Sequence, residues 1–259
     1  KALCTIGLCE KGYVDFELSY TAKGGHSSRP GENFATTMIA KALIAIQEHP
    51  MPYRVTDTIR RRFGVLAPYM AKENPELAEL LKNPDENLEK LVPYLKKDPA
   101  LDAMFHTTVV PTMLSGSAQA NILPAKVTAV VNSRVLEGDT VESVKKHLEE
   151  IVPDEVEVRV LKGSDASPTS LYDGAMKDLL VEIGGKIYGD VIPCPEMMLG
   201  GTDARFVYDM SDRVYRFSTI YAREDHHVHA ANEFTGVEEL ADSIDFYMEL
   251  LTRYGETAK

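Results

Sequence analysis

The sequence predicts an α/β protein with two units: a four-stranded α+β unit, and a smaller α/β unit after it. Two observations point to this fold class. Segments with the two-residue alternation of half-buried strands, such as residues 14–20, are interleaved with segments whose apolar residues recur at helical spacing, such as residues 33–49. The 259 residues are also 44% hydrophobic and 26% charged, which provides enough apolar material for a sizeable core.

The first unit extends over about residues 12–164 and predicts the order strand, helix, strand, strand, helix, strand. Its first strand alternates apolar with polar residues from Val14 onward, and its first helix, over residues 33–49, ends at two prolines. Asp139 with Glu142 forms a capping box for the second helix. The other three strands are expected at residues 106–114, 127–135 and 156–160. This order is the split β-α-β arrangement of a ferredoxin-like sheet.

A helical insertion is expected inside this unit, over about residues 53–105. It contains three short helical patterns, at residues 76–81, 88–95 and 101–105. Asn-Pro, Val-Pro and Asp-Pro dipeptides separate these patterns, and such dipeptides mark helix boundaries. We therefore expect several short helices between two core elements.

The smaller unit follows Pro168, and the opening residues 1–9 read as a strand or the approach to one. Thr235 and Glu238 form a capping box for the last helix. The other elements are expected as helices at residues 172–188 and 202–208 and strands at residues 191–199 and 213–219. Two strands are few for the open sheet that α/β units form, so this unit looks incomplete.

Composition excludes several classes of function. The formal net charge of −12 argues against a nucleic-acid-binding surface, because phosphate contacts need clustered Lys and Arg. No apolar run approaches the ~20 residues that a membrane span requires. Cys4, Cys9 and Cys194 are odd in number, which favours free thiols in a reducing cytoplasm. Because the chain begins with Lys rather than Met, we expect that it is cut from something longer.

Residues 225–233 hold three of the seven histidines and are the candidate metal-binding segment. Imidazole is the commonest zinc ligand, and on an extended strand His227 and His229 would lie on one face. Two alternatives stay open. The loop could be a histidine-rich surface loop, or His227 and His229 could form a small mononuclear site with Asp225 or Glu233.

Six motifs occur in order over nearly the whole chain. They are Gly24-Gly25-His26-Ser27-Ser28-Arg29-Pro30, Asn121-Ile122-Leu123-Pro124, Val131-Asn132-Ser133-Arg134, Gly138-Asp139-Thr140, Gly201-Thr202-Asp203-Ala204-Arg205 and Val228-His229-Ala230-Ala231-Asn232-Glu233. In order and approximate spacing the chain resembles the dinuclear zinc peptidases, the relatives of aminoacylase, carboxypeptidase S and succinyl-diaminopimelate desuccinylase (peptidase family M twenty). The helical insertion is most similar to that of the carboxypeptidase S branch.

The resemblance implies a lid domain that interrupts a catalytic domain. Residues 12–165 would form the lid, and residues 1–11 with 166–259 would form the C-terminal part of an α/β zinc-peptidase catalytic domain. The lid would pair with the lid of a second subunit, giving a homodimer, and would send His26 into the neighbouring active site. There His26 would stabilise the oxyanion that forms when water attacks an amide carbonyl.

The same resemblance implies substrate and metal contacts. Asn121 and Arg134 would bind substrate, with the guanidinium of Arg134 as a planar fork for a terminal carboxylate. Gly201 and Thr202 would contact the reacting group, and Asp203 would cap or brace the short helix. For Arg205, substrate binding and a salt bridge within that helix are equally open.

His229 would be the last metal ligand of that site. The residue after it is Ala230, where the family usually has Gly, and His226 and His227 match no ligand position.

The family places its other zinc ligands and its general-base Glu before the lid, and this sequence has no such portion. A catalytic zinc needs about three protein ligands. We therefore expect an incomplete site for two zinc ions, and a chain that is inactive alone although its family cleaves small peptides or N-acyl amino acids. The alternative is a non-catalytic dimerisation or binding module derived from that family.

Overall fold

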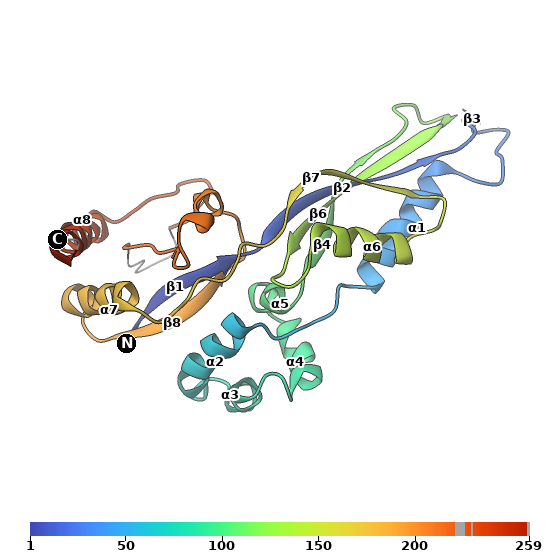
Figure 1. The fold of residues 1–259 in the computed structure, drawn as a ribbon. Helices are drawn as coiled ribbons and strands as arrows, with labels where there is room; N and C mark the ends of the chain where they lie inside the picture. Colours follow the sequence, from blue (N-terminus) through green and yellow to red (C-terminus); the bar gives the residue numbers. More distant parts are fainter. Residues whose placement is uncertain (221–225, 229, 258–259) are drawn as a thin grey trace.

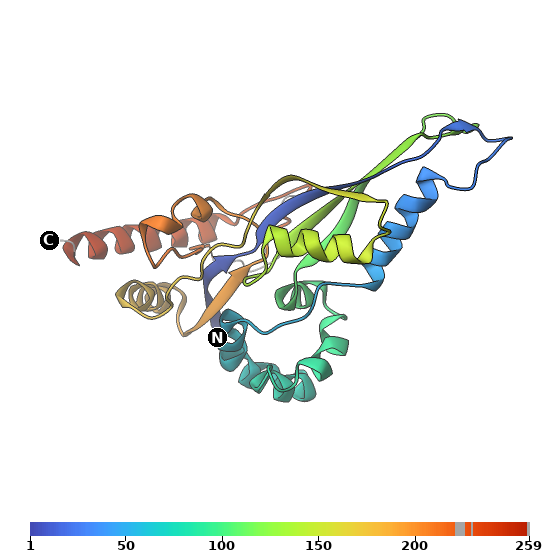
Figure 2. The ribbon, with the colours of Figure 1, turned by 45° about the vertical axis from the view of Figure 1, so that its right-hand side comes forward.

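The structure is a computed structural model that describes residues 1–220, 226–228 and 230–257, with residues 256 and 257 described through their backbone alone. The molecule is elongated, with a four-stranded sheet towards one end and the first strand and last helix towards the other (Figures 1 and 2). None of the helices in the described ranges combines the length and apolarity needed to cross a membrane.

The four-stranded sheet contains the predicted strands of the first unit. They are β2 (Gly12–Thr21), β4 (Thr108–Ser115), β6 (Lys126–Val135) and β7 (Glu157–Ser164), in the order β4-β6-β2-β7 with every pair antiparallel. The helices α1 (Ala35–Glu48) and α6 (Val141–Ile151) cover one face (Figure 1). The alternation predicted in the first strand is confirmed, because Val14, Phe16 and Leu18 are fully buried beneath these helices.

The start of α6 corrects one sequence prediction. The capping box is formed by Thr140 and Ser143, one residue later than the predicted Asp139 and Glu142. The carboxylate of Asp139 instead accepts hydrogen bonds from the Arg54 guanidinium and the Thr107 hydroxyl. Asp139 therefore ties the insertion to the strands rather than capping the helix.

The insertion holds four helices where three were predicted. The three expected helices are α3 (Pro75–Lys82), α4 (Leu88–Leu95) and α5 (Pro99–Phe105). The sequence reading missed α2 (Asp57–Met70), whose last turn contains Pro68. Its signals were present: the Thr56 hydroxyl accepts from the Ile59 amide at 3.3 Å, and the buried residues Ile59, Phe63 and Ala67 recur at helical spacing.

The insertion packs against the smaller unit as well as against the base of the sheet. Its apolar core contains Phe63 stacked on Phe105 at 5.8 Å, together with Leu136, which follows β6, and Met197 of β8 (Val191–Met198). Arg62 forms an ion pair with Glu196 at 3.1 Å. The helices form an arc beside β8 (Figures 1 and 2).

The smaller unit is built on two parallel strands, β8 and β1 (Ala2–Glu10). The helices α7 (Ala175–Tyr188) and α8 (Val237–Thr257) lie beside them, and the predicted helix over residues 202–208 is two 3-10 turns, η1 (Asp203–Phe206) and η2 (Tyr208–Met210). The predicted strand over residues 213–219 is wrong. In the described residues its backbone pairs with the sheet through one bridge, in which Arg216 and Gly7 exchange hydrogen bonds of 2.9 and 2.8 Å.

The last helix also begins differently from the prediction. It starts at Val237, and the carboxylate of Glu239 accepts a hydrogen bond from the Gly236 amide at 3.0 Å. The acidic residue that satisfies this amide is thus one position later than the predicted Glu238.

Candidate active site

A two-stranded ribbon at the far tip of the large sheet brings two predicted site residues together. It pairs β3 (Gly25–His26) with β5 (Ile122–Leu123), with His26 opposite Ile122. The Ser27 amide donates to the carbonyl of Asn121 at 3.0 Å. His26 and Asn121 therefore share one exposed structural element, although the sequence alone did not link them.

The hydrogen bonds of the His26 ring fix which nitrogen can donate. Nδ1 accepts from the Ser28 amide at 3.2 Å and lies 2.8 Å from the Ser28 hydroxyl. A backbone amide can only donate, so in the neutral ring the proton is on Nε2. The ribbon therefore presents an outward-facing N–H donor at its exposed end.

Arg134 lies at the opposite end of β6. In the register it pairs with Tyr13, whereas Lys126, near the tip, pairs with Thr21. At about 3.3 Å per residue, the eight-residue separation places Arg134 roughly 26 Å along the strand from the tip. Within one chain, Arg134 therefore does not form a single clamp with His26 and Asn121.

Aromatic and charged neighbours fix the Arg134 side chain. Its guanidinium lies 4.7 Å from the Tyr13 ring centroid, and the Tyr13 hydroxyl donates to Asp15 at 2.9 Å. Asp15 also accepts from Asn132 at 2.8 Å and lies 3.4 Å from Lys162. These bonds hold the pKa of Asp15 below its ordinary value, against the opposing effect of desolvation. The Asp15 carboxylate is thus bonded to other partners, and the Arg134 guanidinium, stacked on Tyr13, keeps its planar fork available for an anion.

The predicted Gly-Thr contact is held by a buried glutamate that the sequence reading missed. Thr202 donates to Glu10 Oε2 from its amide at 2.9 Å and from its hydroxyl at 2.5 Å. The same hydroxyl accepts from the Ala204 amide at 3.2 Å, so Thr202, and not the predicted Asp203, caps η1. Gly201 lies beside this anchored residue. The available signal was a charged pair, Glu10-Lys11, that ends an apolar strand.

Arg205 is exposed, and its guanidinium lies 4.8 Å from the centroid of the Phe206 ring. This stacking contact is not the salt bridge expected within the short helix, and substrate binding by Arg205 stays a prediction. One guanidinium nitrogen of Arg205 also lies 3.4 Å from the position that a Cβ would take at Gly201.

His229 lies outside the described residues, as does Asp225 of the alternative mononuclear site. The extended conformation expected at His227 is wrong: its φ is +55°, and its carbonyl accepts from the Ala230 amide at 2.8 Å, which makes a turn. Across the described residues, no group of three His, Cys, Asp or Glu side chains is arranged to hold a metal. A zinc site is therefore not assembled from them.

His226 has a structural partner. Its Nε2 lies 2.8 Å from the Glu239 carboxylate, at ion-pair distance but without hydrogen-bond geometry, and its ring packs on Phe234 at 5.3 Å. The Phe234 amide donates to the His226 carbonyl at 3.2 Å. His226 thus closes the histidine loop onto the start of α8.

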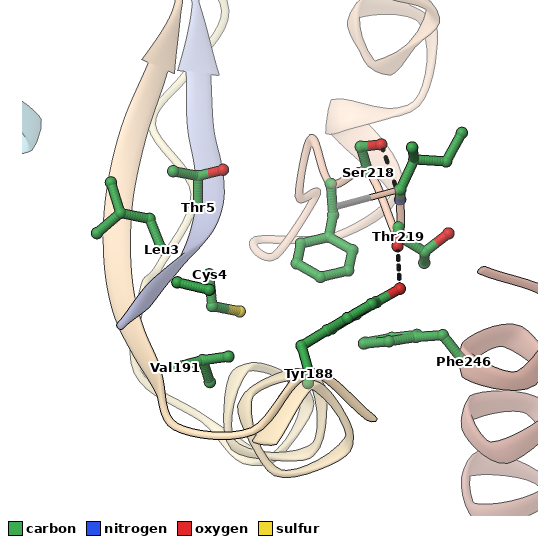
Figure 3. A pocket seen from close by; sticks show the side chains of 12 residues that line it. Leu3, Cys4, Thr5, Tyr188, Val191, Ser218, Thr219 and Phe246 are labelled. Atoms are coloured by element: carbon green, nitrogen blue, oxygen red, sulfur yellow. Dashed lines mark hydrogen bonds between the residues drawn. The ribbon is translucent and has the colours of Figure 1, made fainter. Parts of the chain in front are cut away.

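A small cavity of about 100 Å³ lies between β1, the end of α7 and α8 (Figure 3). Cys4, Tyr188 and Phe246 line it, and the Tyr188 hydroxyl donates to the Thr219 carbonyl at 2.5 Å across one side. Burial raises the pKa of the Cys4 thiol to about 11, so at neutral pH it is a protonated apolar group and not a nucleophile. None of the described candidate site residues lines this cavity.

Comparison with known proteins identifies the large sheet. A family model for the peptidase dimerisation domain of M20 peptidases matches residues 9–159. A probable carboxypeptidase S-like protein 2 of Dictyostelium discoideum is 25% identical over 97% of this chain and 48% of its own length. The human N-fatty-acyl-amino acid synthase/hydrolase PM20D1 is 27% identical over 97% of this chain and 51% of its own length. The chain thus spans about half the length of these curated relatives.

Solved structures support the same fold. The di-peptidase Dug1p of Saccharomyces cerevisiae matches with a TM-score of 0.63 at 15% identity, over 98% of this chain and 57% of that one. The M20 metallo-carboxypeptidase Sso-CP2 of Sulfolobus solfataricus matches with a TM-score of 0.62 at 18% identity, over 96% of this chain and 60% of that one. Because the dimerisation-domain model covers more than half of the 259 residues, the chain belongs to the M20 family of metallopeptidases.

Proposed function

We propose that this chain supplies the lid, part of the substrate clamp and one metal ligand of a zinc-dependent hydrolase of peptide or N-acyl-amino-acid amide bonds. The observation that carries the proposal is the tip ribbon, which holds His26 and Asn121 together. The names of the relatives, which include carboxypeptidase S and N-fatty-acyl-amino acid hydrolases, fit this substrate class.

The proposed domain division assigns residues 12–165 to a ferredoxin-like lid, and residues 1–11 with 166–259 to part of a catalytic domain. The strand order β4-β6-β2-β7, with both helices on one face, supports the lid assignment. We place the protein in the cytoplasm because Cys4, Cys9 and Cys194 are all unpaired and buried.

A homodimer through the lid is the second part of the proposal. The edge strand β4 exposes Val110, Met113 and Leu114, and the neighbouring helix α1 exposes Ile44. Two lids that pair along this edge would cover these side chains. The dimer would also explain the roughly 26 Å between the tip and Arg134 along β6, because the tip of one subunit could reach the Arg134 end of the other. Asn121 would then accompany His26 into the neighbouring site.

In this arrangement the residues of the chain have separate tasks. The Nε2–H of His26 would donate to the oxyanion of the attacked amide, and Arg134 would hold a terminal carboxylate. Zinc, when bound, would polarise the carbonyl and lower the pKa of a water molecule. The described residues do not form a site for it, so two zinc ions would need His229 together with ligands from the half of the relatives' length that this chain does not span.

The experiment measures hydrolysis of N-acetyl-L-leucine and of a dipeptide by the purified chain, together with its zinc content and its mass in solution. We expect a dimer, less than one zinc per chain, and no hydrolysis that a chelator abolishes. Steady chelator-sensitive hydrolysis, or one to two zinc ions per chain, would show a complete site and contradict the proposal. A Met113→Lys variant should shift the dimer to monomer, whereas Lys162→Met on the opposite edge strand should not.

The alternative, a non-catalytic dimerisation or binding module, is favoured by one observation: the large sheet has a complete core of its own. Binding of N-acetyl-L-leucine separates the two. The hydrolase proposal predicts binding that Arg134→Lys weakens about tenfold, because Lys keeps the charge but loses the fork. A dimer that does not bind this ligand would favour the module.

A further inference from the structure

The carboxylate of Glu10 lies where the chain passes from the smaller unit into the large sheet. Glu10 is the last residue of β1, and only Lys11 separates it from β2. The residue is 3% exposed. Its Oε2 accepts both polar hydrogens of Thr202, the amide at 2.9 Å and the hydroxyl at 2.5 Å. We call this junction of β1 and β2, residues 10–12, the hinge. One buried oxygen therefore connects the hinge to a loop that is far away in the sequence.

Where the chain passes back from the large sheet to the smaller unit, Ser167 is bound to the backbone of Glu10. The Glu10 amide donates to the Ser167 hydroxyl at 2.9 Å, and Arg216 Nη2 donates to that hydroxyl at 2.9 Å. Arg216 is also buried, and its Nε lies 3.5 Å from Glu10 Oε2. Arg216 Nη1 donates to the carbonyls of Leu8 and Val214. The charge of Glu10 is thus balanced by a guanidinium whose own position is fixed.

This network restricts Thr202 more than packing would. The Thr202 hydroxyl donates to Glu10 and accepts from the Ala204 amide, so its rotation is set. A buried ion pair is weak evidence for stability, because desolvation of both charges offsets their attraction. The buried Glu10–Arg216 pair is better explained by the need to hold the Thr202 loop in one geometry, because functional groups need support from fixed neighbours.

The loop so held is bonded to the residue that leads into the strand paired with the Arg134 end of β6. Gly12, two residues after Glu10, pairs with Val135, the neighbour of Arg134 on β6. Glu10 therefore connects two parts of the candidate site. It bonds to the loop of residues 200–202, and it leads into the strand that pairs with the Arg134 end of β6. Apart from its two chain neighbours, no residue has an atom within 4 Å of the position that a Cβ would take at Gly200, which leaves space on that side of the loop for a ligand.

We propose that Glu10 is a positioning residue. It fixes the Gly200–Thr202 loop against the junction of β1 and β2, so that the loop and Arg134 contact the same N-acyl amino acid or peptide. The substrate part rests on the proposed function, and the positioning part does not. Glu10 acts through Thr202 and does not itself contact the substrate.

The test measures amide hydrogen exchange by NMR in the full 259-residue chain and in Glu10→Ala and Glu10→Gln variants. Exchange of the Thr202 amide should accelerate about ten- to hundredfold in Glu10→Ala, the range expected for a lost hydrogen bond to a charged group. Glu10→Gln keeps an acceptor oxygen and should lie between Glu10→Ala and the wild type. The reference amides of Leu91 and Val144, bonded within α4 and α6, should change less than about twofold.

A matched variant, Glu17→Gln, removes one carboxylate that pairs with Arg159 on the sheet. It should leave Thr202 exchange unchanged. An unchanged Thr202 rate in Glu10→Ala would overturn the proposal, and so would equal acceleration of the reference amides, because Glu10 would then support only the fold. If Glu10→Ala does not fold, Glu10→Gln against Glu17→Gln gives the same comparison.

Titration with N-acetyl-L-leucine separates this inference from the proposed function. Glu10→Ala and Thr202→Val should each weaken binding about tenfold, and Thr202→Ser, which keeps the hydroxyl, should bind more tightly than Thr202→Val. Unchanged affinity in Glu10→Ala would overturn the link between the loop and the substrate. If the wild-type chain does not bind while Thr202 exchange still depends on Glu10, the positioning stands and the proposed substrate fails.

Discussion

The helices α6 and α8 are both amphipathic, but their apolar sides lie in different environments. The apolar side chains of α6, such as Val144 and Leu148, are fully buried against the large sheet. On α8, Phe246 is buried, but seven large apolar side chains remain exposed: Val237, Leu240, Ile244, Tyr247, Met248, Leu251 and Tyr254. Apolar spacing therefore predicts a helix without predicting how much of its apolar side is covered.

The sheets beneath the two helices differ in the same way. The large sheet has four antiparallel strands and one continuous core with α1 and α6. In its described residues the smaller unit has two parallel strands. Cys9 and Met197 join the apolar core of the insertion, and two small clusters hold other buried apolar residues of this unit. Parallel sheets normally have both faces covered and more strands than two. The large sheet is thus covered on one face by its own helices, whereas the smaller unit leaves apolar side chains of α8 exposed.

The most direct way to break this comparison is a matched pair of leucine substitutions. Leu148→Ala on α6 should lower the free energy of unfolding by about 2–5 kcal/mol, because it leaves a cavity in a full core. Leu251→Ala on α8, where the side chain is 69% exposed, should change it by less than about 0.5 kcal/mol. Urea unfolding measures both. Equal costs would mean that α8 is covered in solution.

The next effect concerns Lys11, which joins the insertion to the hinge. Its ammonium donates to the carbonyls of Ala103 and His106 at 2.6 and 2.7 Å, and burial lowers its pKa to about 8. Between about pH 8 and pH 10.4 the unfolded chain binds a proton that the folded chain lacks, so this group makes stability rise with pH, by up to about 3 kcal/mol. Below about pH 8 both states are protonated and the penalty of the buried charge is complete.

Lys11→Met removes this titration and provides the control. The unfolding free energy of the wild type minus that of Lys11→Met should increase between pH 7.5 and pH 10. Taking the difference cancels the contribution of the buried thiols, which oppose it because burial raises the pKa of Cys4, Cys9 and Cys194. Parallel stability curves for the two proteins would contradict the prediction.

A pair of glycine substitutions sharpens the contrast between hinge and helix. At Gly12 a Cβ would lie 2.5 Å from the Ser164 carbonyl oxygen, so Gly12→Ala should destabilise the chain by about 1–3 kcal/mol. Gly185 lies within α7 with no atom within 4 Å of its Cβ position, and Gly185→Ala should stabilise by about 0.5–1 kcal/mol. Thermal unfolding should therefore show shifts of opposite sign. Shifts of the same sign would mean that the hinge strands can separate.

The smallest effect tests the cap of α6. Thr140→Ala removes the side chain that accepts from the Ser143 amide and should cost about 1 kcal/mol. The measurement is urea unfolding, in which the midpoint concentration should fall while the dependence of the unfolding free energy on urea concentration stays the same. Glu142→Ala, which removes the acceptor that a capping box with Asp139 would need, tests the prediction made from the sequence; a larger loss for this variant than for Thr140→Ala would support that prediction.

Local patterns predicted most elements of the fold. The alternation from Val14, the helix that became Ala35–Glu48, and the three short helices of the insertion could be read from neighbouring residues. The wrong prediction of a strand at residues 213–219 has a physical cause. The segment around Arg216 has the composition of a strand, but a strand requires a continuous ladder, and here the described partner is Gly7 alone.

The candidate site shows the same division. Motifs predicted His26, Asn121 and Arg134 as site residues one by one, but the pairing of β3 with β5 joins the first two, and the length of β6 separates them from the third. Glu10 carried no motif at all. A buried charge is recognisable only when its partners, here Thr202 and Arg216, are brought to it by the fold.

The sequence by itself determined most element types, the order of strands and helices along the first unit, and the family, because periodicity, capping residues and ordered motifs are properties of the chain as written. Only the tertiary structure decided that the insertion packs against β8, that α8 keeps an exposed apolar side, and that Thr202 is anchored to the hinge. Those outcomes depend on contacts between residues far apart in the chain, where geometry selects one partner among many that local chemistry allows.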